Sequence, residues 1–248
     1  MHRFYIPPEQ CRDAVIELTD TEAHHALRVL RLQTGERVTV LDGVGQELLC
    51  KVRTAARHTV TLAVLHRNTS PPLPCQITLL QAVPKAKAMD YIIQKATELG
   101  AARVVPILSE RTVIQLDGED AADKAEKWQQ IAIESIKQCG SPWLTKIEPP
   151  VTLKNYLARR EKFDLPLIAS LQDAVRHPRE FIQHFRDEHN RLPTTAGVWI
   201  GPEGDFSPAE MNVLKAAGAL PMTLGRLVLR SDTAAIYSLS VLHYELQD

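Results

Sequence analysis

The sequence predicts a two-domain α/β protein, in which a small β-barrel precedes a larger domain built on a parallel sheet. Three observations carry this prediction: β-rich segments fill residues 1–70, the proline-rich stretch NTSPPLP follows at 68–74, and apolar strands alternate with helices from residue 75 onward. Prolines cannot pair inside a sheet and stiffen the chain into an extended spacer. We therefore place the two domains at 1–70 and 75–248.

The first domain reads as short strands around one helix. The predicted strands cover residues 3–6, 14–18, 37–41, 47–52 and 60–65. Thr19 and Glu22 have the spacing of a capping box, which predicts that the helix begins there. Asp42 and Gly43 are typical of a tight turn between two strands. This pattern favours a small β-barrel.

The second domain alternates between two kinds of segment. Its predicted strands cover residues 76–83, 104–108, 165–169, 197–200 and 222–224. Its predicted helices cover residues 87–99, 123–139 and 181–188, and two more begin after Ser207 and near Asp232. This alternation indicates a parallel sheet that is covered by helices.

The composition narrows the class of protein. The chain has 248 residues with 44% hydrophobic and 24% charged, as ordinary globular proteins do, and its net charge of −1 creates no overall field to attract nucleic acid. It lacks a signal-peptide pattern and any apolar run near the roughly 18 residues that cross a bilayer, so we expect neither export nor a membrane partner. The four cysteines have neither metal-site nor disulfide spacing, which predicts reduced thiols, no metal and a cytoplasmic location.

Two loops are candidates for a ligand site, because ligands of parallel sheets bind beyond the carboxyl ends of the strands. The first is the glycine turn, residues 201–206 with the sequence GPEGDF, which follows a predicted strand and precedes a strong helix start at Ser207. Its glycines let the backbone approach a ligand closely. On spacing alone, a turn that binds no ligand is as plausible as a ligand site. Glu203 slightly favours the site, because a turn between two glycines does not need a carboxylate. The turn is not G-x-G-x-x-G, which disfavours dinucleotide binding.

The second candidate is the arginine loop, residues 224–230, which continues into the last helix in the string LGRLVLRSDTA. Ser231 or Asp232 is expected to cap that helix. Arg230 lies near the helix N-terminus, where a cation opposes the helix dipole. A solvated surface cation is one explanation of Arg230, and a functional role is the other.

At these loops the sequence resembles a known family. GPEGDF and LGRLVLRSDTA are similar to the two cofactor-loop motifs of the 16S ribosomal RNA uridine-N3 methyltransferases, within the SPOUT superfamily. Further matches, in the same order, cover nearly the whole chain: HHALRVLRLQTGE, DGVGQE, QAVPKAKAMDYIIQKATELGA, SERTV and KWQQIAIESIKQCG. The chain departs from the family at Asp205, where a second glycine is usual, at Leu227, often Arg, and at Asp232, usually Glu.

The resemblance implies a fold and a function. The fold is a SPOUT-type parallel sheet with a C-terminal trefoil knot, preceded by a PUA-like, RNA-binding β-barrel, in a homodimer. The function is methylation of uridine N3 in 16S rRNA within the 30S subunit, with S-adenosyl-L-methionine as cofactor. The implied cofactor contacts are Ser170, Leu171, Ile200, Gly201, Pro202, Glu203, Gly204, Leu224, Gly225, Leu229 and Ser231.

Three charged residues are the candidate catalytic groups. Uracil N3 carries a proton that must leave, so the enzyme must favour the deprotonated base. Arg230 could stabilise the negative charge that develops on the uracil oxygens. Glu203 or Asp232 could accept the proton, or could hold Arg230, and the sequence leaves these roles open.

Candidate RNA contacts are dispersed along the chain. Solvated surface charge is the simpler explanation for any single one of them, and only the set is persuasive. The candidates are Arg3, His24, Arg28 and Arg31 in the first domain, and Lys85, Lys95 and Arg111 in the second.

Other functions remain open. A related SPOUT enzyme could methylate another RNA base or a ribose 2′-hydroxyl. A protein of a different class could bind RNA through the barrel and keep a silent α/β domain, and calorimetry with S-adenosylmethionine would separate that class from the enzymes. A Rossmann-type dehydrogenase is a weaker possibility, since the glycine fingerprint is missing.

Overall fold

The computed structural model describes residues 1–84, 88–112, 118–171 and 176–247. The chain forms two compact units, and one of them consists of Met1–Pro72 together with Ile133–Leu144. The sequence pattern predicts a single block for 75–248, so the position of 133–144 differs from the prediction. These residues include the end of α3 (Gly118–Cys139), where the buried Lys137 forms an ion pair with Glu22 at 2.7 Å, inside the same unit.

The first unit is built on a five-stranded sheet in the order β1-β3-β4-β5-β2. Its strands are β1 (Arg3–Tyr5), β2 (Val15–Leu18), β3 (Arg37–Leu41), β4 (Gln46–Ala55) and β5 (Val60–Thr69). β1 runs parallel to β3, and the other pairs are antiparallel. Phe4, Leu18 and Leu62 are fully buried in its core. The register shifts twice along β4, and such bulges bend a strand.

The connections in this unit confirm one prediction and correct another. Asp42 accepts hydrogen bonds from the Val44 and Gln46 amides at 2.8 Å in the predicted turn between β3 and β4. Thr19 precedes α1 (Asp20–His24), but its side chain makes no capping hydrogen bond, so the predicted capping box is wrong. The Glu22 carboxylate, which would bond back to the Thr19 amide in a capping box, bonds instead to Lys137, a buried cation that requires an anionic partner. α1 continues into a π-helix, η2 (His25–Val29), and a short η1 (Pro8–Gln10) follows β1.

The second unit contains the predicted parallel sheet, in the order β12-β10-β11-β6-β7-β8. Its strands are β6 (Gln76–Ala82), β7 (Arg103–Leu108), β8 (Lys146–Ile147), β10 (Leu165–Ala169), β11 (Thr195–Ile200) and β12 (Leu220–Met222), and β9 (Val151–Thr152) also pairs with β7. β11 is buried without interruption over 196–200, as expected of a strand that is covered on both faces.

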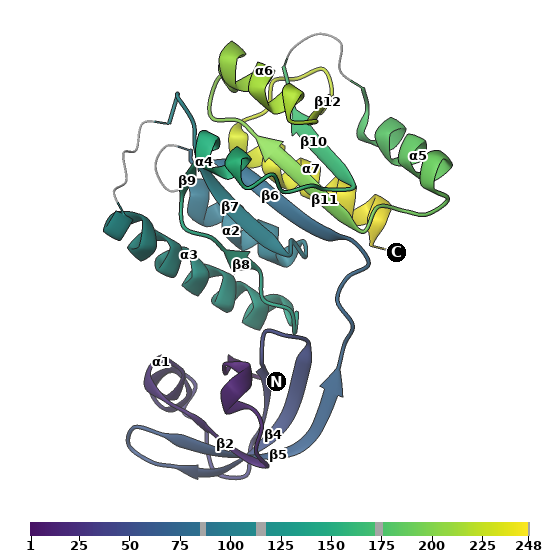
Figure 1. The fold of residues 1–248 in the computed structure, drawn as a ribbon. Coiled ribbons are helices and arrows are strands. Elements are labelled where there is room, and N and C mark those ends of the chain that lie inside the picture. The colour runs from purple at the N-terminus through teal and green to yellow at the C-terminus, as the bar shows by residue number, and fades with distance from the viewer. Residues whose placement is uncertain (85–87, 113–117, 172–175, 248) are drawn as a thin grey trace. The chain divides into compact units, whose positions relative to one another are not determined.

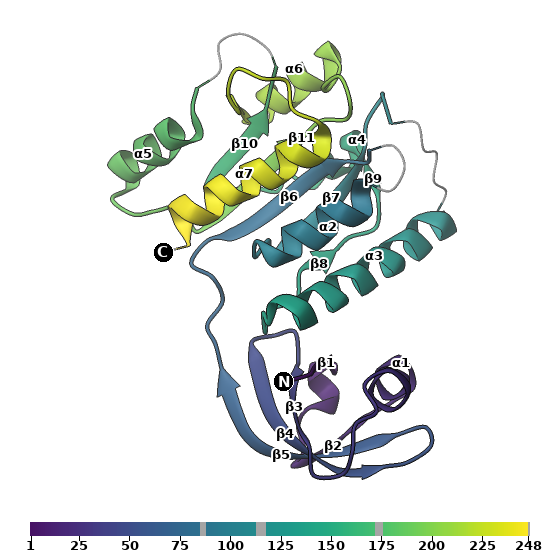
Figure 2. The same ribbon diagram turned by 180° about the vertical axis from the view of Figure 1, so that it is seen from behind.

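Helices cover both faces of this sheet (Figures 1 and 2). α4 (Leu153–Ala158) and α6 (Pro208–Ala216) pack on one face, where the Tyr156 and Trp199 rings meet edge to face at 5.2 Å. α2 (Ala88–Glu98), α5 (Pro178–His189) and α7 (Ser231–Leu246) lie on the other face. The α/β prediction is confirmed. In the described part of the chain, no helix has the length and apolarity that a membrane span requires.

The strand order brings together three loops that are distant in sequence. β10, β11 and β12 are parallel, and β11 lies between β10 and the earlier strand β6. Their carboxyl ends therefore lie at one edge of the sheet, and they lead into the segment 170–171, the glycine turn and the arginine loop. Ligands of open parallel sheets bind at such an edge.

Candidate functional site

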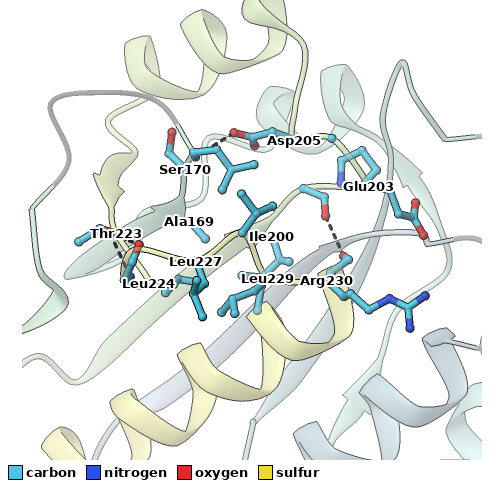
Figure 3. Close-up of a pocket in the computed structure, with 18 of the residues that line it drawn as sticks. Ala169, Ser170, Ile200, Glu203, Asp205, Thr223, Leu224, Leu227, Leu229 and Arg230 are labelled. Atoms are coloured by element: carbon cyan, nitrogen blue, oxygen red, sulfur yellow. Dashed lines mark hydrogen bonds between the residues drawn. The ribbon is translucent and has the colours of Figure 1, made fainter.

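A cavity of about 510 Å³ lies at this edge of the sheet (Figure 3). Its walls come from the ends of β10 and β11, from the residues that follow β10, β11 and β12, and from the first turn of α7. A cavity of this volume falls within the range of small-molecule sites, about 300–1,000 Å³. The second unit therefore offers one preformed site to which three loops contribute.

All of the predicted cofactor contacts line this cavity, from Ser170 to Ser231. Other lining residues, Asp205, Arg226, Leu227 and Val228, belong to the two predicted loops without having been named as contacts, whereas Ala169, Thr223 and Ala234 lie outside those loops. Thr223 had a readable signal, since a threonine two residues before a glycine suits a tight turn. In the structure Thr223 Oγ1 accepts a hydrogen bond from the Gly225 amide at 3.1 Å, and Gly225 has a φ of +110°.

A buried chain of hydrogen bonds holds the beginning of the glycine turn. Ser231 Oγ donates to the Gly201 carbonyl at 2.8 Å and accepts from Gln81 Nε2 at 2.9 Å. Gln81 is completely buried near the end of β6. These bonds connect β6, the glycine turn and the start of α7. Both partners of the Ser231 hydroxyl are therefore groups of the protein itself. Arg230, and not Ser231 or Asp232, occupies the N-cap position of α7, and its side chain makes no capping hydrogen bond. Of the two residues that were predicted to cap the helix, Asp232 accepts from a free amide of the first turn, that of Thr233, at 2.7 Å.

The end of the glycine turn is anchored by the predicted helix start, which is confirmed as a capping box. Ser207 Oγ accepts from the Glu210 amide at 3.2 Å, and the Glu210 carboxylate accepts from the Ser207 amide at 3.0 Å. The same buried carboxylate accepts from the Glu110 amide at 2.8 Å. Glu210 therefore joins the loop after β7 to the N-terminus of α6.

Arg111 also holds the glycine turn. Its guanidinium donates to the Gly204 carbonyl and, at 3.2 Å, to the Asp205 carbonyl. Gly204 has a φ of +91°, a conformation that side chains rarely adopt. Arg111 was predicted as an RNA contact, and the structure gives it a role in fixing the backbone of the turn, while its exposed side chain leaves the RNA role a prediction.

The three candidate catalytic residues occupy different positions. Arg230 and Glu203 line the cavity and are exposed, and both side chains extend at the end of the cavity that lies opposite Leu224 (Figure 3). Asp232 is not among the described residues that line the cavity, and its Oδ1 accepts from the Thr233 amide at 2.7 Å in the first turn of α7. The geometry therefore brings Arg230 and Glu203 to one site.

The predicted RNA contacts of the first unit lie in different surroundings. Arg3 donates to the Gln138 carbonyl at 3.2 Å, at the C-terminus of α3, where a cation is favoured by the helix dipole. Arg28 and Arg31 are exposed and line the same surface hollow. His24 is exposed at the end of α1.

For the other predicted RNA contacts of the second unit, Lys95 and Lys85, the structure says less about a contact with RNA. Lys95 forms an ion pair with Glu98 at 2.7 Å on the surface of α2. Lys85 lies outside the described residues. Their proposed contact with RNA remains a prediction.

The cysteines are all free thiols. Cys11, Cys50 and Cys75 are buried, and burial raises their pKa values to about 12, about 11 and about 12. Cys139 is exposed. Across the described ranges, no three His, Cys, Asp or Glu side chains gather as a possible metal site.

The sequence matches family models in both units. A model described as an RNA methyltransferase domain matches residues 71–243, and one described as an RNA methyltransferase PUA domain matches 18–65. The chain is 32% identical to the ribosomal RNA small subunit methyltransferase E of Synechocystis, over 99% of this chain and 78% of that protein. It is also 32% identical to the Aquifex aeolicus protein of the same name, over 98% of this chain and 99% of the relative.

Solved structures agree with these matches. A putative methyltransferase of Legionella pneumophila, in complex with its bound cofactor SAM, has a TM-score of 0.86 and 32% identity over 98% of this chain and 97% of that one. The ribosomal RNA small subunit methyltransferase E of Neisseria gonorrhoeae, bound to S-adenosyl methionine, has a TM-score of 0.84. It is 28% identical in sequence over 99% of this chain and 98% of that one. The resemblance predicted from the sequence motifs is confirmed, and the chain belongs to the ribosomal RNA small subunit methyltransferase E family.

Proposed function

We propose that this chain transfers the methyl group of S-adenosylmethionine to N3 of a specific uridine in the 16S rRNA of the small ribosomal subunit. The observation that carries the proposal is the cavity formed by the residues that follow β10, β11 and β12, whose lining includes every position expected to contact the cofactor. Family membership supports the reaction class, and two solved relatives hold this cofactor in their structures.

The cavity suits this cofactor chemically. Backbone amides and carbonyls of the glycine turn and the arginine loop can bond to the adenine and ribose, while Leu224 and Leu229 offer apolar walls. Glu203 at the edge of the cavity suits a cationic ligand. When bound, the sulfonium group supplies the methyl carbon to N3, and the electrons of the broken carbon–sulfur bond stay on sulfur.

The residues of the chain prepare the base for this transfer. Arg230 stabilises the negative charge that spreads over the uracil oxygens when N3 loses its proton. Glu203 accepts that proton, a role that its position on the cavity favours over Asp232. The loops hold the reacting groups in line, which contributes to the rate through orientation.

We further propose a homodimer whose subunits associate through exposed apolar groups of the arginine loop and of α7. Leu227 and Val228 are 78% and 77% exposed, and Tyr244 on α7 is 72% exposed. Large exposed apolar side chains favour association. Sedimentation is expected to give twice the mass of the chain, and a monomer at micromolar concentration would contradict the dimer.

We also propose that the C-terminal segment is threaded as a trefoil knot. The buried bonds from Ser231 to Gln81 of β6 and to Gly201 support a last helix that is tied into earlier parts of the domain. Connections avoid threading in most proteins, so sequence patterning gives no signal for it. An experimental structure traced from β10 to α7 tests the knot directly.

The reaction can be tested with ribosomal material from cells that lack this protein. Purified protein and S-adenosylmethionine are added to 30S particles or to bare 16S rRNA, and the modified nucleotide is mapped by mass spectrometry. We expect N3-methyluridine at one position, formed faster on assembled particles. Equal methylation of bare RNA would contradict the particle preference.

The same experiment separates the alternative functions. A methyl group on another base or on a ribose 2′-hydroxyl would indicate a related enzyme of different specificity. An absence of both methylation and calorimetric cofactor binding would favour a protein that only binds RNA.

A further inference from the structure

Asp205 is the least expected residue of the glycine turn. Its φ is +68°, in the left-handed region that most side chains avoid and that Asp adopts more readily than other types. A glycine at this position would avoid the conformational cost. The side chain of Asp205 therefore requires an explanation in its own contacts.

The Asp205 carboxylate joins two of the loops that line the cavity. Oδ1 accepts from the Phe206 amide at 2.8 Å, within the glycine turn, and Oδ2 accepts from the Leu171 amide at 3.2 Å, in the loop after β10. Figure 3 shows the carboxylate directed across the edge of the cavity toward the Ser170 segment. Ser170 in turn donates its amide to the Met222 carbonyl at 3.1 Å. Residues 170–171, which directly follow β10, are thus held from both sides.

The neighbouring residues leave room for this carboxylate. A Cβ added to Gly201 would lie 3.1 Å from Asp205 Oδ1, which is tighter than most real Cβ contacts. The backbone of Asp205 is fixed separately, because its amide donates to the Pro202 carbonyl at 3.0 Å and its own carbonyl accepts from Arg111 at 3.2 Å. A change of the side chain therefore leaves the other restraints on the turn in place.

We propose that Asp205 is a positioning residue for the cofactor cavity. Its carboxylate latches the loop after β10 to the glycine turn, so that the cavity has its binding shape before the methyl donor arrives. This inference rests on the proposed function, since it concerns the same cavity. A preformed site binds more tightly because the ligand does not have to order the loops.

The latch can be tested with Asp205→Asn. An asparagine has one acceptor oxygen, so it cannot accept from the Phe206 and Leu171 amides together, and the bridge between the two segments is lost. Asp187→Asn is the matched control, since it removes the same charge from an exposed side chain on α5 whose carboxylate accepts from Gln183 at 2.7 Å. Calorimetry measures the affinity for S-adenosylmethionine and for its demethylated product, and hydrogen exchange without ligand measures protection of the Leu171 amide.

For Asp205→Asn we expect an affinity about tenfold weaker for both ligands, since loss of a latch acts on the shape of the site. The Leu171 amide should exchange faster, the KM for the cofactor should rise, and kcat at saturation and the melting temperature should stay near wild type. Asp187→Asn should change none of these quantities.

The outcomes separate the two claims. Wild-type protein that binds no S-adenosylmethionine would overturn the proposed function along with the latch. Wild-type binding that Asp205→Asn leaves unchanged, or unchanged exchange at Leu171, would overturn the latch alone. A lower melting temperature with unaltered affinity would assign Asp205 to stability only.

Discussion

At the scale of single residues, several side chains of the site serve the protein itself. Ser231 and Arg111 donate hydrogen bonds to backbone carbonyls of the glycine turn. The sequence could predict which loops meet, because glycine turns after apolar strands mark the carboxyl edge of a parallel sheet. It could not predict where each polar side chain points, since that depends on partners far away in sequence, such as Gln81 for Ser231.

Arg230 is the residue whose replacement should affect catalysis most. It is exposed at the N-cap of α7, so its loss should leave the fold intact. We expect Arg230→Ala to reduce kcat about 10²–10³-fold, the usual effect of losing one donor to a developing anion. Arg230→Lys keeps the charge without the planar fork and should retain part of the rate. Methylation of ribosomal substrate by Arg230→Ala at the wild-type rate would refute this role.

Glu203→Gln tests the proposed base. The variant keeps the size of the side chain and removes its ability to accept a proton, so turnover should fall strongly and the acid limb of the pH–rate profile should change. The measurement is single-turnover methylation over a range of pH at saturating cofactor. An unchanged profile would remove Glu203 as the base and return Asp232 as the candidate.

At the scale of elements, periodicity and caps predicted the long segments well and the short ones poorly. The capping box at Ser207 is confirmed, whereas the one at Thr19 is wrong: the Thr19 side chain makes no capping bond, and Glu22 bonds to Lys137. β8, β9 and α4 were not predicted. The two-residue strands β8 and β9 are too short to show alternation, and they form through pairing with β7.

Glu210→Ala should destabilise the second unit. The change leaves the buried Ser207 amide and the partly buried Glu110 amide without their acceptor. We expect the free energy of unfolding to fall by about 1–2 kcal/mol, as for the loss of a helix cap. Urea denaturation checks this, with the exposed Glu126→Ala on α3 as the charge-matched control. Equal stability of the two variants would contradict the anchoring role.

Asp164 should make stability depend on pH. Hydrogen bonds from Arg191, at 2.8 Å, and from Thr194 hold the pKa of the Asp164 carboxyl well below its usual range. A lowered folded pKa stabilises the fold fully above the unfolded pKa of about 4, and that contribution is lost as the pH falls toward the folded value. Asp164→Asn should therefore cost about 1 kcal/mol at pH 7 and progressively less below pH 4. A difference that is constant from pH 7 to pH 2 would contradict this account.

At the scale of the whole molecule, the proline-rich stretch predicted a division of the chain, and the units divide between Pro72 and Leu73. The assignment of residues 133–144 to the first unit was not predictable, because α3 is one continuous amphipathic helix in the sequence. Its last turns join the first unit through side chains such as Lys137 and through the Arg3 contact. Helical periodicity identifies the apolar face of a helix but not the unit against which each end of the helix packs.

The central claim is that three loops from neighbouring parallel strands enclose the methyl donor. A crystal structure of the protein soaked with S-adenosylmethionine tests it most directly. We predict the donor in the cavity, in contact with residues that follow β10, β11 and β12. Donor bound at another place, with this cavity empty, would contradict the account.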